Sequence, residues 1–327
     1  MQVAAKAFGF WPGQYYTLVQ SSFAGSITLK KNGTLSAFLA YALWGVLPLY
    51  WKGLQQLSAT EILAHRIVWS LVLIAGVLAI TRRWGWLKDV VQNPRGYLRF
   101  VATALILGVN YGVYLWANNS GHLVEASLGY FINPLVNVVL GMVFLRERLR
   151  PGQAVAVIIA TLGVAYLTFS YGRLPWIALT LAGTFGVYGL LRKTAKLGSI
   201  EGLTLEMALL FVPAMVLLAV LGSQGTGAFG RSGAGATLLM MGTGAATAIP
   251  MILFTHGARR VTMTTLGILQ YIAPTLQFLI GVFVFGEGFD QSRLIGFMMI
   301  WIALAIYWVE GYAVYRRRNE KLAGQRG

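Results

Sequence analysis

The sequence contains no cysteine among its 327 residues, and it has few charged residues. The absence of cysteine excludes disulfide bonds, thiolate nucleophiles and sulfur-ligated metal sites. Charged residues make up 11% of the chain and apolar residues 57%, whereas soluble domains carry roughly 25% charged residues. A composition of this kind is typical of a membrane protein.

Acidic residues are especially scarce: the chain has 10 Asp and Glu but 26 Lys and Arg. Its formal net charge is therefore +16. The basic residues lie between long apolar runs, so lipid headgroups are their expected neighbours and nucleic acid is not an expected partner. The sequence also has no GxxxxGK[ST] nucleotide loop, no His/Glu metal motif and no nucleophile with a paired base. We therefore expect neither an ATPase nor another enzyme, and no cofactor or metal.

One apolar stretch with a central proline occurs twice. It reads GYFINPLVNVVLGMVFLRE at 129–147 and GILQYIAPTLQFLIGVFVFGE at 267–287. Its proline, glycine and final glutamate recur 140 positions later, as Pro134 and Pro274, Gly141 and Gly281, and Glu147 and Glu287. A weaker match, offset by 141, aligns WGVLPLYWK at 44–52 with FGVYGLLRK at 185–193. These spacings predict an internal repeat.

Ten apolar segments follow one another from Gly33 onward, each long enough to cross a hydrocarbon core of about 30 Å. They lack the alternation of outer-membrane strands, so we predict an all-α membrane protein. The predicted spans are 33–51, 61–81, 97–118, 123–145, 152–170, 174–191, 203–222, 236–258, 262–286 and 291–315. We expect 1–32 to be a poorly ordered tail without a signal peptide, and 316–327 to be a basic cytoplasmic tail.

Lys and Arg are concentrated in alternate connections between these spans. The other connections hold only Lys52, Arg173, Arg231 and Arg293. By the positive-inside rule, both termini are then cytoplasmic. Because an odd number of spans separates the two copies of the repeat, the copies run in opposite directions. We predict two inverted five-helix halves, 33–170 and 174–315, which is an arrangement typical of secondary transporters.

Four stretches carry a family resemblance. They are ATEILAHRIVWS at 59–70, YLWANNSGHLVEASLGYF at 114–131, LGYFINPLVNVVLG at 128–141 and GILQYIAPTLQFL at 267–279. Together they resemble the bacterial RarD proteins, in the EamA-type branch of the drug/metabolite transporter superfamily. The resemblance covers nearly all of 33–315. It implies a ten-helix bacterial inner-membrane protein with inverted halves, and the family's description as chloramphenicol-sensitive implies a permease.

Ionisable residues occur inside the second predicted span. Such a residue costs roughly 2.5 to 3.5 kcal/mol on insertion scales, which makes it a candidate for function. Glu61, His65 and Trp69 share one helix face near the end predicted to be periplasmic, with Arg66 beside them. Two interpretations stay open: a gate or binding group, or an interfacial anchor in which Arg66 pairs with Glu61. His65 is either a protonation switch or an ordinary hydrogen-bonded histidine.

Amides and aromatic residues gather around the two prolines, each of which removes a backbone hydrogen bond and is a predicted helix kink. For a single amide the simpler interpretation is an interhelical hydrogen bond, whereas the set from both halves predicts a polar central cavity. Including the second span, the predicted substrate-cavity residues are Trp44, His65, Arg66, Trp69, Asn110, Tyr114, Tyr130, Asn133, Asn137, Tyr188, Gln270, Tyr271 and Gln277. We predict kinks at Pro134 and Pro274, and a structural ion pair between Glu147 and its neighbouring arginines.

The expected function is secondary transport, namely the export of small amphiphilic or polar metabolites or drugs by alternating access. The expected partners are the small-molecule substrate and membrane lipids, and a homodimer is left open. The alternative is a membrane-embedded sensor or enzyme without transport activity. An enzyme would place an ionisable pair deep in one half, whereas a transporter would place polar residues of both halves around one cavity.

Overall fold

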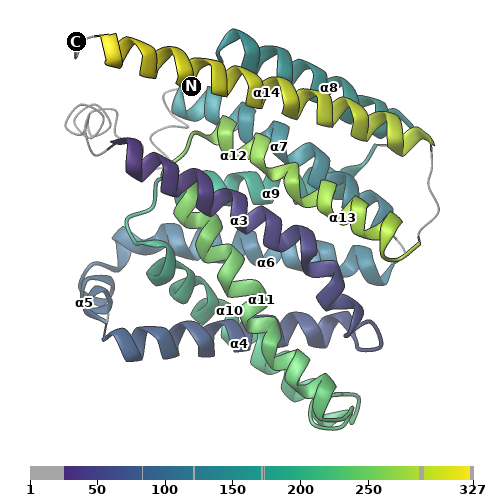
Figure 1. The fold of residues 1–327 in the computed structure, drawn as a ribbon. Coiled ribbons are helices and arrows are strands. Elements are labelled where there is room, and N and C mark those ends of the chain that lie inside the picture. The colour runs from purple at the N-terminus through teal and green to yellow at the C-terminus, as the bar shows by residue number, and fades with distance from the viewer. Residues whose placement is uncertain are drawn as a thin grey trace.

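The computed structural model describes residues 26–82, 84–120, 122–170, 172, 174–286 and 291–324. The first half contains α3 (Ser26–Lys52), α4 (Ala59–Thr81), α5 (Gly85–Gln92), the 3-10 helix η1 (Pro94–Tyr97), α6 (Leu98–Asn119), α7 (Leu123–Leu145) and α8 (Pro151–Ser170). The second half contains α9 (Trp176–Lys193), α10 (Ser199–Ser223), α11 (Ala234–Ala258), α12 (Met263–Gln270), α13 (Ile272–Phe283) and α14 (Gln291–Gly324). Figure 1 shows the long helices running back and forth in one bundle.

Nine helices within the described ranges are long and apolar enough to cross a membrane. The prediction of an all-α, multi-pass membrane protein is therefore confirmed. The sixth predicted span, α9, is not among the nine. It has 18 residues, and Arg192 and Lys193 in its last turn reduce its apolar character. It packs against both α6 and α7 within the bundle.

Two predicted ends lie elsewhere in the structure. Helix α3 begins at Ser26 instead of residue 33, and α14 continues to Gly324 instead of ending near 315. A helix can continue past its apolar span because its backbone hydrogen bonds are satisfied internally, in lipid or in water. Both outer ends lie on the same side of the bundle, at the left in Figure 1, which we call the terminal side. The predicted N-terminal tail up to residue 25 lies outside the described residues.

The helix packing repeats itself when the two halves are exchanged. Each helix except the short α5 and η1 has a counterpart in the other half. The pairs are α3 and α9, α4 and α10, α6 and α11, α7 and α12–α13, and α8 and α14. Helix α9 packs on α7 as α3 packs on α13, and α9 packs on α6 as α3 packs on α11. Helix α4 packs on its own counterpart α10, and α8 packs on α14, which Figure 1 shows as an outer layer. This exchange symmetry is what two inverted five-helix halves require.

The two copies of the repeated stretch lie against each other in the middle of the bundle. The Tyr271 hydroxyl donates to the Phe131 carbonyl oxygen at 3.3 Å, and these two residues are 140 positions apart. Each is thus the other's counterpart, and a residue that contacts its own counterpart lies at the pseudo-twofold axis. Beside this contact, Asn137 Nδ2 donates to Gln270 Oε1 at 2.8 Å. The axis therefore passes between α7 and α12.

The two prolines of the repeat differ in their effect on the helices. Helix α7 runs without interruption through Pro134, whereas the second copy is divided at Tyr271 into α12 and α13. Pro274 has no N–H to donate to the carbonyl of Gln270, so the regular ladder is lost one turn before the proline. Tyr271 N instead donates to Ile268 O at 3.3 Å, and Thr275 N donates to Tyr271 O at 3.1 Å. The helix is therefore broken in the second copy only, and the kinks predicted at Pro134 and Pro274 stay predictions.

The close approach of α7 and α12 depends on a glycine. A Cβ at Gly267 would lie 2.5 Å from the carbonyl oxygen of Pro134. We expect Gly267→Ala to lower the free energy of unfolding by about 1–3 kcal/mol, because the two helices must separate to admit the methyl group. Gly76→Ala is the control, since nothing lies within 4 Å of its added Cβ. Thermal unfolding in detergent would measure both, and equal stabilities would contradict the close packing.

Candidate functional site

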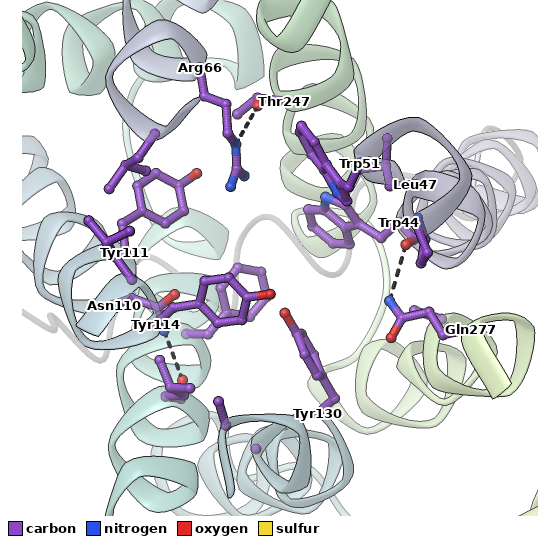
Figure 2. Close-up of a pocket in the computed structure, with 18 of the residues that line it drawn as sticks. Trp44, Leu47, Trp51, Arg66, Asn110, Tyr111, Tyr114, Tyr130, Thr247 and Gln277 are labelled. Atoms are coloured by element: carbon purple, nitrogen blue, oxygen red, sulfur yellow. Dashed lines mark hydrogen bonds between the residues drawn. The ribbon is translucent and has the colours of Figure 1, made fainter. Parts of the chain in front are cut away.

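A cavity of about 540 Å³ enters the bundle from the side opposite the termini. Leu54, Gln55 and Leu57 of the α3–α4 connection line it at that end. Deeper in, side chains come from α3, α4, α6 and α7 of the first half and from α9, α11, α12 and α13 of the second half. Figure 2 shows these side chains surrounding one common space. The cavity thus lies between the two halves.

Eight of the predicted residues line this cavity, and five lie outside it. Those that line it are Trp44, Arg66, Asn110, Tyr114, Tyr130, Asn133, Gln270 and Gln277, together with the predicted kink residue Pro274. The lining does not include His65, Trp69, Asn137, Tyr188 or Tyr271, nor Pro134.

The face of α4 that carries His65 and Trp69 looks away from the cavity, toward the α10–α11 connection. The His65 ring stacks on Phe229 with centroids 4.6 Å apart. Its Nε2 lies 3.8 Å from Oε1 of Glu61, which accepts hydrogen bonds from Ala228 N at 2.8 Å and Phe229 N at 3.0 Å. These contacts fix the connection to the end of α4. Arg66 follows His65 by about 100° around the helix and therefore enters the cavity instead.

The other three predicted residues outside the cavity are buried in helix contacts. Tyr188 donates to Glu206 Oε2 at 3.0 Å, between the cavity and the terminal side of the bundle. Tyr271 lies at the pseudo-twofold axis described above. Asn137 is 1% exposed and donates to Asn133 Oδ1 at 3.1 Å as well as to Gln270. Its position between the two copies of the repeat explains why its amide does not face the open space.

Glu147, which closes the first copy of the repeat, holds the start of α12. Its carboxylate accepts hydrogen bonds from Met263 N at 2.7 Å, from Thr264 N at 3.0 Å and from Thr264 Oγ1 at 2.9 Å. An anion at a helix N-terminus satisfies backbone N–H groups and complements the helix dipole. Glu147 therefore stabilises the structure as a helix cap, and not by the predicted ion pair with its neighbouring arginines. Its counterpart Glu287 lies outside the described residues.

Several amides of the cavity wall are engaged in joining the two halves. Asn133 Nδ2 donates to Ala182 O of α9 at 2.7 Å, and Gln277 Nε2 donates to Trp44 O of α3 at 3.2 Å. Asn110 Nδ2 donates to Leu181 O at 3.0 Å and to Thr184 Oγ1 at 2.8 Å, both on α9. These bonds satisfy polar groups that would otherwise be costly in the bundle. The groups left to contact a solute are chiefly Arg66 and the tyrosine hydroxyls.

Residues that sequence reasoning missed complete the surroundings of Arg66. Its Nε donates to Thr247 Oγ1 at 3.0 Å, and its guanidinium carbon lies 5.2 Å from the ring centroids of both Trp51 and Tyr111. Figure 2 shows the end of the side chain pointing into the open space. Trp51 lies at a span end, where an interfacial anchor is the usual interpretation, and Thr247 carries no sequence signal. The position of Tyr111 next to Asn110 was the one available clue.

An aromatic cluster closes the inner end of the cavity. It consists of Tyr41 and Trp44 of α3, Phe185 and Tyr188 of α9, and Phe254 of α11, and we call it the aromatic floor. The Phe254 ring centroid lies 5.1 Å from that of Phe185 and 5.6 Å from that of Trp44. Tyr188 stacks on Phe254 at 6.3 Å with an interplanar angle of 16°. These contacts separate the cavity from the terminal side.

A buried ion pair lies beneath the aromatic floor. Arg192 Nε and Glu206 Oε1 are 3.5 Å apart, and both side chains are 0% exposed. Glu206 also accepts from Thr103 Oγ1 at 2.6 Å and from the Tyr188 hydroxyl at 3.0 Å. The guanidinium carbon of Arg192 lies 5.3 Å from the ring centroid of Phe100. This network joins α6, α9 and α10 on the closed side of the cavity.

Known proteins resemble this chain closely in sequence. The profile of the EamA-like transporter family matches residues 31–169. "Protein RarD" from Streptomyces exfoliatus is 44% identical over 293 residues, which cover 90% of this chain and 93% of that protein. The chain belongs to the RarD family of EamA-like transporters. "Protein RarD" from Escherichia coli (strain K12) is 39% identical over 290 residues, covering 89% of this chain and 98% of that protein.

Two further comparisons agree with this membership. A relative named "Uncharacterized transporter YojE", from Bacillus subtilis (strain 168), is 46% identical over 282 residues, covering 85% of this chain and 93% of that protein. A solved crystal structure superposes on this RarD-family chain with a TM-score of 0.65 at 19% identity, covering 85% of this chain and 97% of the other. That likeness shows a shared fold. With its apolar helices, the chain is a membrane transporter of the drug/metabolite type.

Proposed function

We propose that this chain is a bacterial inner-membrane permease that exports small amphiphilic or polar metabolites or drugs by alternating access, without ATP. The single observation that carries the proposal is the cavity shared by both halves, which reaches one side of the bundle and is closed toward the other. Inverted halves around one central site are the usual architecture of secondary transporters. With both termini in the cytoplasm, the cavity faces the periplasm.

One difference between the halves supports movement around this site. On the closed side, α9 packs on α11 through Phe185, Tyr188 and Phe254. The counterpart pair on the open side, α3 and α6, makes almost no contact. The two halves are related by the exchange symmetry. A second state, in which α3 packs on α6 while α9 and α11 separate, would therefore use the same kinds of contact as the present state.

The residues at the two places correspond. Tyr188 aligns with Leu47 by the offset of 141, and Phe254 aligns with Tyr114 by the offset of 140. Leu47 and Tyr114 line the open cavity, whereas Tyr188 and Phe254 are 0% exposed. Rocking of one half against the other would exchange these roles and would deliver the cavity to the cytoplasm.

Filling the cavity should reduce transport. Leu47 lines the cavity, whereas Leu49, two positions along α3, is 48% exposed on the outside of the bundle. We expect Leu47→Trp to slow solute flux strongly because the indole occupies space that the solute needs, and Leu49→Trp to transport like the natural chain. Right-side-out vesicles loaded with a panel of radiolabelled amphiphilic solutes would be measured for efflux. Chloramphenicol belongs in the panel, since one relative is named "Chloramphenicol-sensitive protein RarD".

Vesicles without the protein give the passive leak for each solute. Folded protein that accelerates none of the solutes above that leak would overturn the proposed function. Equal flux in the two tryptophan variants would instead show that the solute does not pass through this cavity.

A further inference from the structure

We infer that the cavity selects solutes that carry one anionic group, such as a carboxylate, on an apolar and preferably aromatic body, and that Arg66 binds the anion. This inference rests on the proposed function and names its substrate class. It depends on three observations: the charge of the cavity lining, the contacts of Arg66, and the rings around it.

Within the part of the chain that the structure describes, Arg66 is the one charged residue that lines the cavity, and no Asp or Glu lines it. A guanidinium in a partly enclosed space without a carboxylate nearby is incompletely compensated. Among the described residues, Arg66 makes one hydrogen bond, from its Nε to Thr247 Oγ1. Its terminal nitrogens remain to donate to a ligand.

The position of the guanidinium is set by its neighbours. Thr247 fixes Nε, and Trp51 and Tyr111 lie against the group at 5.2 Å each. Contacts of this kind stabilise a cation by the electrons of the ring face and displace water from it. An arginine held by its Nε and its faces presents its two terminal nitrogens as a fork, which matches the two oxygens of a carboxylate. Figure 2 shows this end of Arg66 directed to the centre of the cavity.

The remainder of the cavity suits an apolar body with a few polar atoms. Opposite Arg66, the hydroxyl groups of Tyr114 and Tyr130 point toward one another and into the same space (Figure 2). Trp44 and Phe185 lie edge to face at 5.8 Å and form part of the aromatic floor. Aromatic solutes can pack against such rings in offset or edge-to-face geometry. An anion at Arg66 with a ring directed toward the floor would satisfy both ends.

Three probes with one body and different charge would test the inference: phenylpropionate, phenylpropionamide and phenylpropyltrimethylammonium. Binding would be measured by titration calorimetry of the natural chain in phosphatidylcholine nanodiscs at neutral pH, with empty nanodiscs subtracted. This neutral bilayer contains no anionic lipid headgroup to occupy Arg66. We expect the anion to bind about tenfold to a hundredfold more tightly than the amide, which corresponds to a charge-assisted hydrogen bond, and the cation to bind most weakly.

The variants assign this preference to Arg66. Arg66→Gln should abolish the difference between phenylpropionate and phenylpropionamide, whereas Arg66→Lys should retain part of it. Lys52→Gln is the matched control, because it removes the same charge from the same side of the bundle but from outside the cavity lining. We expect Lys52→Gln to keep the preference. Thr247→Val, which removes the Nε partner, should weaken phenylpropionate binding less than Arg66→Gln.

The inference is overturned if the natural chain binds the amide as tightly as the anion, or if the preference survives in Arg66→Gln. The first of these results needs no variant, so a failure of Arg66→Gln to fold would not protect the inference. Added phosphatidylglycerol should compete with phenylpropionate only if a lipid headgroup reaches Arg66. Flux of neutral solutes without any preference for anions would reject the substrate class while leaving the proposed function intact.

Discussion

A Glu206→Ala variant should lose about 3–5 kcal/mol of its free energy of unfolding, because it leaves the guanidinium of Arg192 buried without a counter-charge. Arg192 is 0% exposed, and its remaining acceptors are the carbonyl oxygens of Gly198 and Ser199, at 3.2 Å and 3.1 Å. These dipoles replace only part of the lost charge. Titration of the purified variant from mild detergent into sodium dodecyl sulfate would measure the loss.

Two comparisons separate a buried charge from a general loss of packing. Replacing both partners, with Arg192→Met and Glu206→Leu together, should recover most of the stability, since apolar groups of similar volume need no counter-charge. Glu310→Ala removes a second ion pair, with Arg150 at 2.7 Å, whose side chains are 19% and 41% exposed. That loss should stay below about 1 kcal/mol. A Glu206→Ala loss as small as that of Glu310→Ala would contradict the buried pair.

Linking α3 to α6 across the cavity should stop transport completely. The chain has no cysteine, so Leu47→Cys with Tyr114→Cys introduces the only two thiols. A short bifunctional maleimide with a cleavable disulfide in its spacer would join them. If α3 and α6 must change their separation for the cavity to change sides, the linked protein cannot complete the cycle. Flux would be measured in proteoliposomes with the best solute from the efflux panel.

Reversal provides the control within the same protein. Cleavage of the spacer by a reductant should restore flux to the level that the double variant shows before linking. Each single-cysteine variant, treated with the same reagent, should lose less flux than the linked protein. Full transport by a protein whose link is verified by mass spectrometry would show that α3 and α6 do not move apart or together during transport.

The fold was largely predictable because the membrane imposes strong rules on sequence. Membrane spans can be predicted from the length and composition of apolar segments. The repeat can be predicted from the fixed spacing of Pro134 and Pro274. The buried pair of Arg192 and Glu206 was not predictable in the same way. Arg192 follows an apolar run and counts as a loop charge in a tally along the chain, yet the structure buries it completely. Counting charges along the chain uses only the position of each residue in the sequence. Burial depends instead on which helices pack against the residue.

The candidate site was predictable in its chemistry but less so in its membership. Helical periodicity correctly groups Glu61, His65 and Trp69 on one face, but periodicity alone does not say which face meets the cavity. Arg66 stands on the face that does. Asn110 and Asn133 lie in the cavity wall, yet their side-chain N–H groups donate hydrogen bonds to another helix. This is the simpler of the two interpretations that the sequence allowed for each amide. The site is therefore set by the choice of neighbouring helices, which sequence patterns do not encode locally.

The contact between Tyr271 and Phe131 has a consequence for how mutations count in a duplicated chain. In a chain with two related halves, each position belongs to one half only, so a substitution at an ordinary position alters the contacts of that half and leaves its counterpart unchanged. A substitution at a position that contacts its own counterpart alters the contact that joins the two halves. The hydroxyl of Tyr271 that donates to the Phe131 carbonyl has no equivalent on Phe131 itself, so a single oxygen atom makes the bond one-directional at this point. At this contact on the pseudo-twofold axis the two halves are therefore not interchangeable.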